Sequence, residues 1–438
     1  MTISDFLNNQ YADSALYINY RSTPSIYDGL KNSARKVVYT IKKNNIKNQL
    51  KVSALGSKVV DTSGYLHGDA SIQGTIVTMS QSYCGSNNFP ILEGIGSFGT
   101  RHTPAAAAPR YIFAKPQSYF DLLFKKEDDG NLTNQFFEGD EIEPMFYMPT
   151  IPLLLVNGCS GIGIGFATKI LARKTENIIQ AIEDKLNNKK LNKELFVPSW
   201  KGFEGKVKYL GENKWEICGI ATINKNKVLI EELPISYNLS NYLKVLKGLK
   251  EKGIIYKYID YSENDKFKFE ITLSPEESNK SENEIFNDLG LIENITENLV
   301  GIDENNSVKE FNSIEEIFNS YYDMKIKFLE KRINSEIERL SNEEKILKEI
   351  YTFISKVIKS EIDVKIKKVD LEKKLKKLKF TFIEKLISLP IYSLTEDKVE
   401  ENKKKWENKV KELNDMKNQT PITLWKKDLK DLKKYIVD

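Results

Sequence analysis

One stretch of the chain combines residue types that suit attack on phosphorus. Four alanines, Ala105 to Ala108, are followed by Pro109, Arg110 and Tyr111. Because alanine has little bulk, a rigid nucleic-acid backbone could approach the two larger side chains closely. The Tyr111 phenol is a possible covalent nucleophile, and the Arg110 guanidinium matches the geometry of phosphate oxygens. The stretch therefore predicts nucleophilic chemistry at a phosphodiester.

The phenol of Tyr111 has to lose its proton in that reaction. A free tyrosine has a pKa near 10, so forming the phenolate at pH 7 costs about 4 kcal/mol. Arg110 can supply part of this energy, and a general base or a divalent metal has to supply the rest. A single tyrosine is weak evidence in a chain with 21 of them. The assignment therefore needs support from other parts of the sequence.

Length and composition are typical of a globular protein with several domains. The 438 residues exceed one ordinary core, and 40% of them are hydrophobic. The net charge of +4 is weak, but residues 1–125 carry 13 Lys and Arg against 7 acidic residues. This local excess suits a polyanion, and a solvated basic face explains it nearly as well.

Some functional classes are excluded by particular residue types. The three cysteines are too widely spaced for a disulfide framework or a metal motif, which favours a reducing compartment. The two histidines, His67 and His102, are too few for a histidine-rich metal site. The N-terminus lacks a signal peptide, and prolines and glycines interrupt the most apolar window, 147–168. We expect a cytoplasmic protein.

The elements before Tyr111 predict a small DNA-binding unit. Apolar residues recur at helical spacing over 30–43, and a second helix is predicted over 69–81 with Asp69 as its N-cap. The link at 61–68 is rich in turn residues, and a phosphate would be favoured at the helix N-terminus beside His67. The pair suits a helix-turn-helix-like unit that enters a major groove, although most helix pairs only form core.

The segment 151–170 combines an apolar run with alternating glycine and isoleucine. The run predicts a buried strand, and a helix is expected from about 174 to 188. A buried strand and a tight turn explain the pattern. The alternative is a backbone platform beneath DNA, with Ile170 as an apolar wedge between base steps.

The remainder divides into a mixed region and a helical region. Alternating apolar residues over 200–275 predict strands, interrupted by a helix at about 239–252. From Phe311 onward, heptad-like spacing predicts a coiled-coil helix about 45 Å long. A second helix from Glu396 is expected to run antiparallel to it. The leucine-rich piece 357–394 would form a compact knob at their tip.

Five short motifs occur in the order seen in the DNA breakage–reunion subunit of type IIA topoisomerases, and the chain resembles that family (gyrase A and topoisomerase IV A). The likeness covers about residues 20–415 and is greatest to the medium subunit of T-even-type phage enzymes. The motifs are Asp28-Gly-Leu-Lys31 with Ala34-Arg-Lys36, His67-Gly-Asp69, Phe98-Gly-Thr100, Ala105 to Tyr111, and Leu155-Val-Asn-Gly158 with Gly161-Ile-Gly-Ile-Gly165.

The resemblance implies roles for particular residues. Tyr111 would attack a DNA phosphodiester and become 5′-phosphotyrosyl, with Arg110 stabilising the developing charge. His67 matches a histidine beside the scissile phosphate, and Ile170 matches an isoleucine that intercalates and bends the DNA. The basic positions near the DNA would be Arg21, Lys31, Arg35 and Lys36.

The implied fold is α+β and multidomain, and the implied assembly is a homodimer on double-stranded DNA. It has a winged-helix domain, a mixed α/β tower, and a long antiparallel coiled coil with a small helical dimer gate. The corresponding residues are an arm at 1–20, the winged helix at 21–125, the tower at 126–310, the coiled coil at 311–420 with its gate at about 357–394, and a tail at 421–438.

Departures from the family pattern refine these expectations. Asn32 replaces a usual proline, and Ala70 and Gly74 occupy the positions of the quinolone-contacting serine and acid. No Asp-x-Asp or ATPase motif occurs, so Mg²⁺ and ATP are expected on an ATPase/Toprim partner subunit, with no metal ligand in this chain. Without a DNA-wrapping domain, ATP-driven relaxation and decatenation are expected rather than negative supercoiling. A phage-encoded protein would act in the host cytoplasm.

Two other functions remain open at this level. A non-catalytic dimer that binds and bends DNA would keep the same fold, although intact Tyr111, Arg110 and His67 argue against it. A structural coiled-coil protein would explain residues 311–420 but not the glycine- and alanine-rich motifs.

Overall fold

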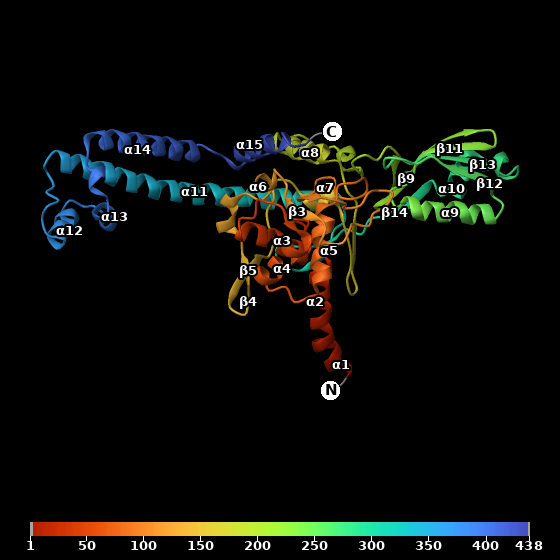
Figure 1. The fold of residues 1–438 in the computed structure, drawn as a ribbon, viewed down its shortest axis with the longest axis horizontal. Coiled ribbons are helices and arrows are strands. Elements are labelled where there is room, and N and C mark those ends of the chain that lie inside the picture. The colour runs from red at the N-terminus through yellow and green to blue at the C-terminus, as the bar shows by residue number, and fades with distance from the viewer. Residues whose placement is uncertain (1–2, 437–438) are drawn as a thin grey trace. The chain divides into compact units, whose positions relative to one another are not determined.

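The structure is a computed structural model that describes residues 3–436, and its elements are shown in Figure 1. Residues 1–2 of the expected arm and 437–438 of the expected tail lie outside the described residues. The chain divides into two units, Met1–Lys325 with Asp428–Asp438 and Ile326–Lys427. None of the described helices combines the length and the apolar character needed to cross a membrane.

The expected arm is helical. A helix α1 (Ile3–Phe6), a π-helical turn (Leu7–Tyr11) and α2 (Ala12–Ser22) follow one another. Its apolar side chains Leu7, Leu16 and Tyr17 are exposed. Ile3, Leu7 and Tyr11 recur four residues apart, but all three are exposed.

Three helices and a small sheet surround the Tyr111 segment. The helices α3, α4 and α5 pack against one another, and the sheet is antiparallel in the order β1-β3-β2. The elements are α3 (Asn32–Lys43), β1 (Leu50–Lys51), α4 (Val52–Ser63), α5 (Asp69–Ser80), β2 (Leu92–Ile95) and β3 (Phe113–Pro116).

Helix α4 corrects the sequence prediction, which treated 61–68 as a link between two consecutive helices. Glycine, serine and β-branched residues give α4 a weak helical propensity, but Val52, Leu55 and Val59 recur at helical spacing and are fully buried. Tertiary packing therefore forms this helix. Asp69 is also not an N-cap: Gly68 holds that position without a side-chain cap, and Asp69 begins the first turn, where its charge favours the helix dipole.

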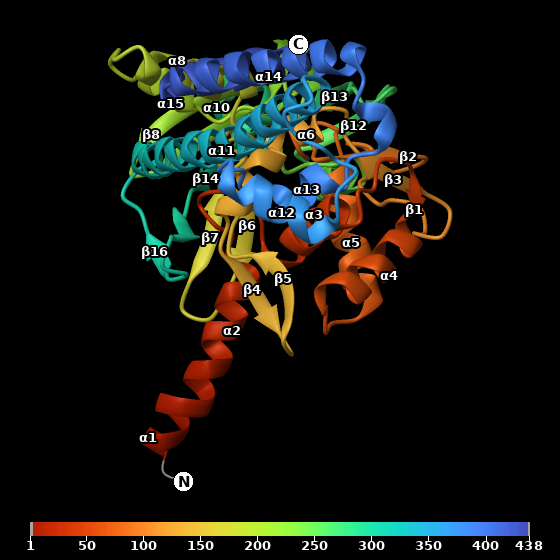
Figure 2. The same ribbon diagram turned by 90° about the vertical axis from the view of Figure 1, so that its left-hand side faces the viewer.

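Short elements follow the sheet. The strands β4 (Asn134–Phe137) and β5 (Asp140–Pro144) form the hairpin seen in Figure 2. Its turn residues Glu138 and Gly139 have φ values of 51° and 92°. The other short elements of this part are α6 (Phe120–Leu123) and a 3₁₀ helix (Lys126–Asn131).

The apolar run that predicted a buried strand at 151–156 forms a helix instead, α7 (Leu153–Asn157). Periodicity does not distinguish a short buried helix from a buried strand, so the sequence prediction was wrong here. The chain continues through the hairpin β6 (Cys159–Ile162) and β7 (Ala167–Ile170), helix α8 (Thr175–Leu186) and a 3₁₀ helix (Lys193–Phe196).

The mixed region forms antiparallel sheets in the orders β10-β11-β13-β12, β14-β9-β8 and β15-β16. Helix α9 (Leu239–Glu251) confirms the predicted helix and packs Tyr242 and Leu246 onto the four-stranded sheet. The strands are β8 (Lys206–Gly211), β9 (Lys214–Cys218), β10 (Ile220–Asn224), β11 (Lys227–Glu232), β12 (Ile255–Asp260), β13 (Phe269–Leu273), β14 (Ile292–Thr296), β15 (Val300–Ile302) and β16 (Val308–Glu310). The helices between them are a 3₁₀ helix (Glu277–Asn279) and α10 (Glu282–Asp288).

The long helix α11 (Ile314–Ile358) has 45 residues, which makes it about 67 Å long and longer than predicted. In the second unit α14 (Glu396–Lys417) lies beside it (Figure 1). Trp406 donates to Glu344 at 2.6 Å, and Lys409 pairs with Glu343 at 3.1 Å, so the two helices run in opposite directions, as predicted.

The piece between α11 and α14 has its own core, as expected for a knob. Leu371, Leu375 and Leu386 pack against Phe353 and Ile354 of α11. Leu378, which was predicted in this knob, is 43% exposed at the end of its helix. The elements here are α12 (Lys368–Lys377), α13 (Ile383–Ile387) and a 3₁₀ turn (Ile391–Ser393), and α15 (Pro421–Lys433) follows α14.

Candidate nucleic-acid interface

Tyr111 and Arg110 form an exposed pair. The Tyr111 side chain is 70% exposed, and the Arg110 guanidinium carbon lies 5.5 Å from the centre of its ring. Neither side chain has an ion-pair partner among residues 3–436. A nucleophile and a permanent cation therefore face solvent together, as the sequence predicted.

The backbone beneath this pair is held by the start of α4. The Ser53 amide donates to the Pro109 carbonyl at 3.2 Å, and the Val52 amide donates to the Ile112 carbonyl at 3.0 Å. These are amides of a first helical turn, which have no acceptors within their own helix. The two bonds flank Tyr111, so its backbone is fixed while its side chain stays accessible.

The loop before Tyr111 is folded on itself. The Gln81 side chain donates to the Phe98 carbonyl at 2.9 Å and to the Pro104 carbonyl at 3.2 Å. Gly99 has a φ of 90°, and a Cβ there would lie 2.4 Å from the Pro104 oxygen. Only glycine fits this position, which accounts for one glycine of the Phe98-Gly-Thr100 motif.

His67 lies in a second cluster, with Arg21 and two tyrosines. Its Nε2 is 2.6 Å from the Tyr17 hydroxyl, and its ring packs edge-on against Tyr65. Partial burial and the Arg21 charge lower the pKa of His67 below its ordinary value. This shift favours the neutral form of His67. None of the contacts within the described residues joins His67 to Tyr111.

Lys31 and Ile170 line the same hollow, which has a volume of about 920 Å³. The hollow lies between the start of α3, one face of α5 and strand β7, and its lining does not include Tyr111, Arg110 or His67. Lys31 is half-buried. Gly161 of β6 lies close to the Ser22 carbonyl, since a Cβ there would lie 2.1 Å from its oxygen.

Two of the four predicted DNA-binding cations are buried in ion pairs. Arg35 is 1% exposed and binds both carboxylate oxygens of Asp28, at 2.8 and 3.2 Å, and the Leu30 carbonyl at 2.9 Å. Burial alone would lower the Arg35 pKa, but the charge and hydrogen bonds of Asp28, together with the nearby Tyr20 and Glu143, outweigh burial and raise that pKa. These partners hold the Arg35 guanidinium in the core.

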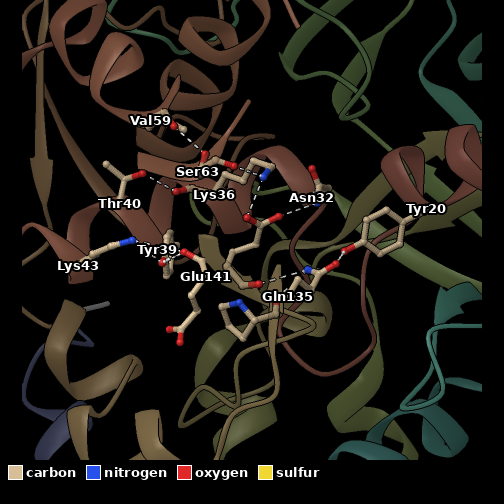
Figure 3. A network of polar contacts seen from close by, with 12 residues as sticks. Tyr20, Asn32, Lys36, Tyr39, Thr40, Lys43, Val59, Ser63, Gln135 and Glu141 are labelled. Carbon is tan, nitrogen blue, oxygen red and sulfur yellow. Dashed lines mark hydrogen bonds and ion pairs between the residues drawn. The ribbon is translucent and has the colours of Figure 1, made fainter. Parts of the chain in front are cut away.

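Lys36 is the second buried cation. Its ammonium pairs with Glu143 at 2.8 Å and donates to the Ser63 carbonyl at 2.6 Å, in the network of Figure 3. Asn32 donates to the other oxygen of Glu143 at 3.0 Å, which a proline could not do. Lys36 therefore ties α3 to α4 and to the β4–β5 hairpin, and Tyr20 extends the network through Gln135.

Ile170 is also not an exposed wedge. Its side chain is only 3% exposed, because the base of the β6–β7 hairpin is covered on one side by the segment 297–300. The exposed apolar residues of that hairpin are Ile162, at 85%, and Phe166 in its loop. Insertion of Ile170 between bases would require the side chain to leave this packing.

The sequence reasoning missed a buried centre that supports the hairpin. Glu297 accepts from Arg173 at 2.8 Å, from the Trp215 indole at 2.9 Å and from the Leu171 amide at 2.7 Å. Arg173 and Glu297 are 124 residues apart, so no local pattern could have connected them. This centre fixes the end of β7 to strand β9.

The residues around Tyr111 do not form a metal site. Its neighbour Arg110 is a cation, and within 3–436 no group of three or more His, Cys, Asp or Glu side chains converges suitably for a metal ion. Hard divalent ions such as Mg²⁺ need oxygen ligands, which are not gathered here.

Comparison with known proteins gives consistent likenesses. A family model that describes the A subunit of DNA gyrase/topoisomerase IV matches residues 21–430. Mitochondrial DNA topoisomerase 2 of Dictyostelium discoideum is 34% identical over 338 residues, covering 76% of this chain and 26% of that protein. DNA topoisomerase 2-beta of Homo sapiens is 32% identical over 342 residues, covering 75% and 21%. The chain spans about a quarter of the length of these relatives.

A solved structure is similar over almost the whole chain. The crystal structure of the Plasmodium falciparum topoisomerase II DNA-binding, cleavage and re-ligation domain matches with a TM-score of 0.88 and 32% sequence identity. The match covers 98% of this chain and 64% of that one. Both the sequence and the fold are therefore shared with these proteins.

Proposed function

Because the chain belongs to the DNA gyrase/topoisomerase IV family of A subunits, we propose that it cleaves and rejoins DNA with Tyr111 as its nucleophile. The observation that carries this proposal is the exposed Tyr111–Arg110 pair on a backbone held by α4. An accessible nucleophile on a fixed backbone meets the requirement for an oriented attack on a large, rigid substrate.

The proposed step is a transesterification. The Tyr111 Oη forms a bond to phosphorus and gives up its proton, and the bond from phosphorus to the 3′ oxygen breaks. The 3′ oxygen takes a proton and leaves as a hydroxyl, while the 5′ phosphate stays on Tyr111. Arg110 binds the non-bridging oxygens as their charge develops, a contribution of about 100-fold to 1000-fold in rate for one such donor. Rejoining reverses each step.

We also propose a role for the second cluster and the hollow. Arg21 is exposed beside His67, and Lys31 lines the hollow without an ion-pair partner among residues 3–436, so both cations can meet DNA phosphates. His67 would approach the scissile phosphate as a neutral hydrogen-bonding group. Arg35 and Lys36 would act indirectly, because their ion pairs fix the helix that carries Lys31.

The metal and nucleotide are proposed to be held elsewhere. Mg²⁺ would lower the energy of the phenolate and of the developing phosphate charge, and the residues near Tyr111 offer no ligand set for it. We therefore place Mg²⁺ and ATP on an ATPase/Toprim partner subunit, and this chain would be the medium subunit of a T-even-type phage enzyme. The assembly would relax and decatenate DNA without supercoiling it. If a phage encodes the chain, this would occur in the host cytoplasm.

Domain names and self-association follow from the same proposal. We assign α3 to α5 with their sheet as the winged helix, the mixed sheets as the tower, and the α12–α13 knob as the dimer gate. The knob carries exposed Val369, Leu378 and Tyr392, which suits an interface between two copies. Sedimentation at micromolar concentration should therefore give a dimer mass, and a monomer mass would count against the gate.

The test of the nucleophile is denaturant trapping of cleaved DNA. The protein is incubated with DNA, Mg²⁺ and its ATPase/Toprim partner, and the adduct is then assayed at DNA 5′ ends. Tyr111→Phe is expected to abolish the adduct. The matched control is Tyr256→Phe, since Tyr256 is 58% exposed on β12, outside the loop that carries Tyr111, and this variant should cleave normally. If Tyr111→Phe still formed the covalent adduct, the assignment of Tyr111 would be disproved. If the native protein bent DNA without forming an adduct, the non-catalytic alternative would be supported.

A further inference from the structure

The loop that carries Tyr111 reaches from the small sheet to the large four-stranded sheet. It joins β2 to β3, which pair at Ile95 and Phe113, and Tyr111 lies near its β3 end. The turn 100–103 lies far from both strands along the chain and is closed by the Thr100 amide donating to the Thr103 carbonyl at 2.9 Å. Arg101 lies in this turn.

Arg101 is buried against the end of strand β11. Its side chain is 5% exposed, and it pairs with Glu232 at 2.6 Å. The same guanidinium donates to the Leu233 carbonyl at 2.9 Å. Its carbon also lies 4.7 Å from the centre of the Phe267 ring, within reach for a cation–π contact. A planar guanidinium can make these contacts at once, whereas a lysine ammonium cannot.

The partner surface is itself well ordered. The Glu232 carboxylate accepts a hydrogen bond from the Leu233 amide at 2.8 Å and another from the Glu204 amide at 3.2 Å. The next loop residue, His102, packs its ring 4.9 Å from Phe267. The turn therefore rests on a carboxylate and an aromatic ring that the four-stranded sheet holds in place.

The segment between Arg101 and Arg110 is stiff. Pro104 and Pro109 bracket the four alanines, and proline restricts both its own φ and the conformation of the residue before it. No glycine occurs between them to provide a hinge. A displacement of the turn at Arg101 would shift this segment and with it Arg110 and Tyr111, although the Gln81 side chain and the Ser97 carbonyl also hold the segment, at Pro104 and Ala107.

We propose that Arg101 is a positioning residue, through which the four-stranded sheet sets the place of Tyr111 relative to the bound phosphate. This inference rests on the proposed function and adds a specific residue to it. A buried ion pair is not needed for stability alone, since apolar residues of similar volume often serve as well or better. What Arg101 adds is a directional attachment for a loop that has no regular structure from 103 to 108.

The test measures covalent adduct at saturating DNA in the complex with the ATPase/Toprim partner. Arg101→Ala is expected to lower adduct formation by about 100-fold, because a nucleophile misplaced by about 1 Å loses that much. Arg101→Lys and Glu232→Gln keep the volume and should give intermediate losses, so a folding failure of the alanine variant leaves the test intact. DNA affinity should stay unchanged in all three variants.

The matched control is Lys280→Gln, which removes another ion pair from the same region without touching the loop. Lys280 pairs with the buried Glu277 at 2.7 Å and with Asp288 at 2.6 Å. The Lys280→Gln variant should cleave DNA at the native level. An equal loss in this variant would mean that any damage to the sheet region impairs cleavage, and it would overturn a specific role for Arg101.

A second readout separates positioning from direct chemistry. A DNA with sulfur in place of the 3′-bridging oxygen has a better leaving group and needs less help to expel it. A misplaced nucleophile should slow the oxygen and sulfur substrates by the same factor. If the sulfur substrate restored cleavage by Arg101→Lys, Arg101 would act on the leaving group, and the proposal would be overturned. Native-level cleavage of the oxygen substrate by every Arg101 variant would overturn it as well. Adduct in Tyr111→Phe would instead overturn the proposed function itself.

Discussion

Arg110 and Arg35 carry the same guanidinium in opposite environments. Arg110 is exposed, and its side chain lies over the ring of Tyr111. Arg35 is buried, and Asp28 binds it through both carboxylate oxygens. Two lysines at the start of α3 show the same contrast. Lys31, the residue before the helix, lines the hollow, whereas Lys36 pairs with Glu143.

This contrast shows that partners and burial decide what each cation does. A buried cation with a fixed carboxylate partner holds the fold, because removal of one charge leaves the other uncompensated. An exposed cation without a carboxylate partner adds little to stability and is available to phosphate. Substitutions in the two groups should therefore affect different measurements.

The largest effect should come from the buried group. Arg35→Ala leaves the Asp28 carboxylate buried without its counter-ion, so the free energy of unfolding should fall by about 3–5 kcal/mol in chemical denaturation. The control is Arg339→Ala on α11, whose side chain is 53% exposed beside Glu336, and it should cost no more than about 1 kcal/mol. Equal losses in the two variants would remove the distinction between the groups.

The exposed guanidinium should show the reverse behaviour. Arg110→Ala should reduce trapped DNA adduct by about 100-fold to 1000-fold, because the developing charge loses a donor. Its free energy of unfolding should stay within about 0.5 kcal/mol of the native value, as for other surface substitutions. A large loss of stability with cleavage retained would place Arg110 in the buried group.

Salt dependence sharpens the contrast at α3. Lys31→Ala should reduce the slope of log affinity against log salt concentration by about 1, because one phosphate contact is lost. Lys36→Met should destabilise the fold but leave this slope unchanged in the folded protein. Fluorescence titration of a DNA duplex at several salt concentrations would measure both, and a changed slope for Lys36→Met would contradict its buried role.

The smallest effect concerns the charge of His67. Its pKa should lie below the ordinary value of about 6.5, because of burial and the Arg21 charge. The unfolded chain then binds a proton at His67 more readily than the folded chain does. The stability that this pKa difference contributes is therefore complete above about pH 6.5 and is lost as pH falls. NMR titration can resolve His67, since the chain has only two histidines. Arg21→Gln should raise the midpoint, and an unshifted midpoint in both proteins would refute the interaction.

The sequence alone determined the features that depend on neighbouring residues. Arg110 and Tyr111 lie together because they are adjacent, and the alanines before them leave the pair accessible. Heptad-like spacing correctly predicted that α11 and α14 form long helices. Period-two alternation predicted β8 to β11 and β13 of the mixed region, but not β12 or β14 to β16. Motif order also indicated the family to which residues 21–430 belong.

Only the tertiary structure decided the features that depend on distant residues. Helix α4 was missed because its weak local propensity is overcome by packing, and the roles of Lys36 and Arg101 depend on Glu143 and Glu232, which are 107 and 131 residues away. The burial of Ile170 likewise depends on the distant segment 297–300. Pattern reports residue type and spacing, whereas burial and ion pairing depend on which segments the fold brings together.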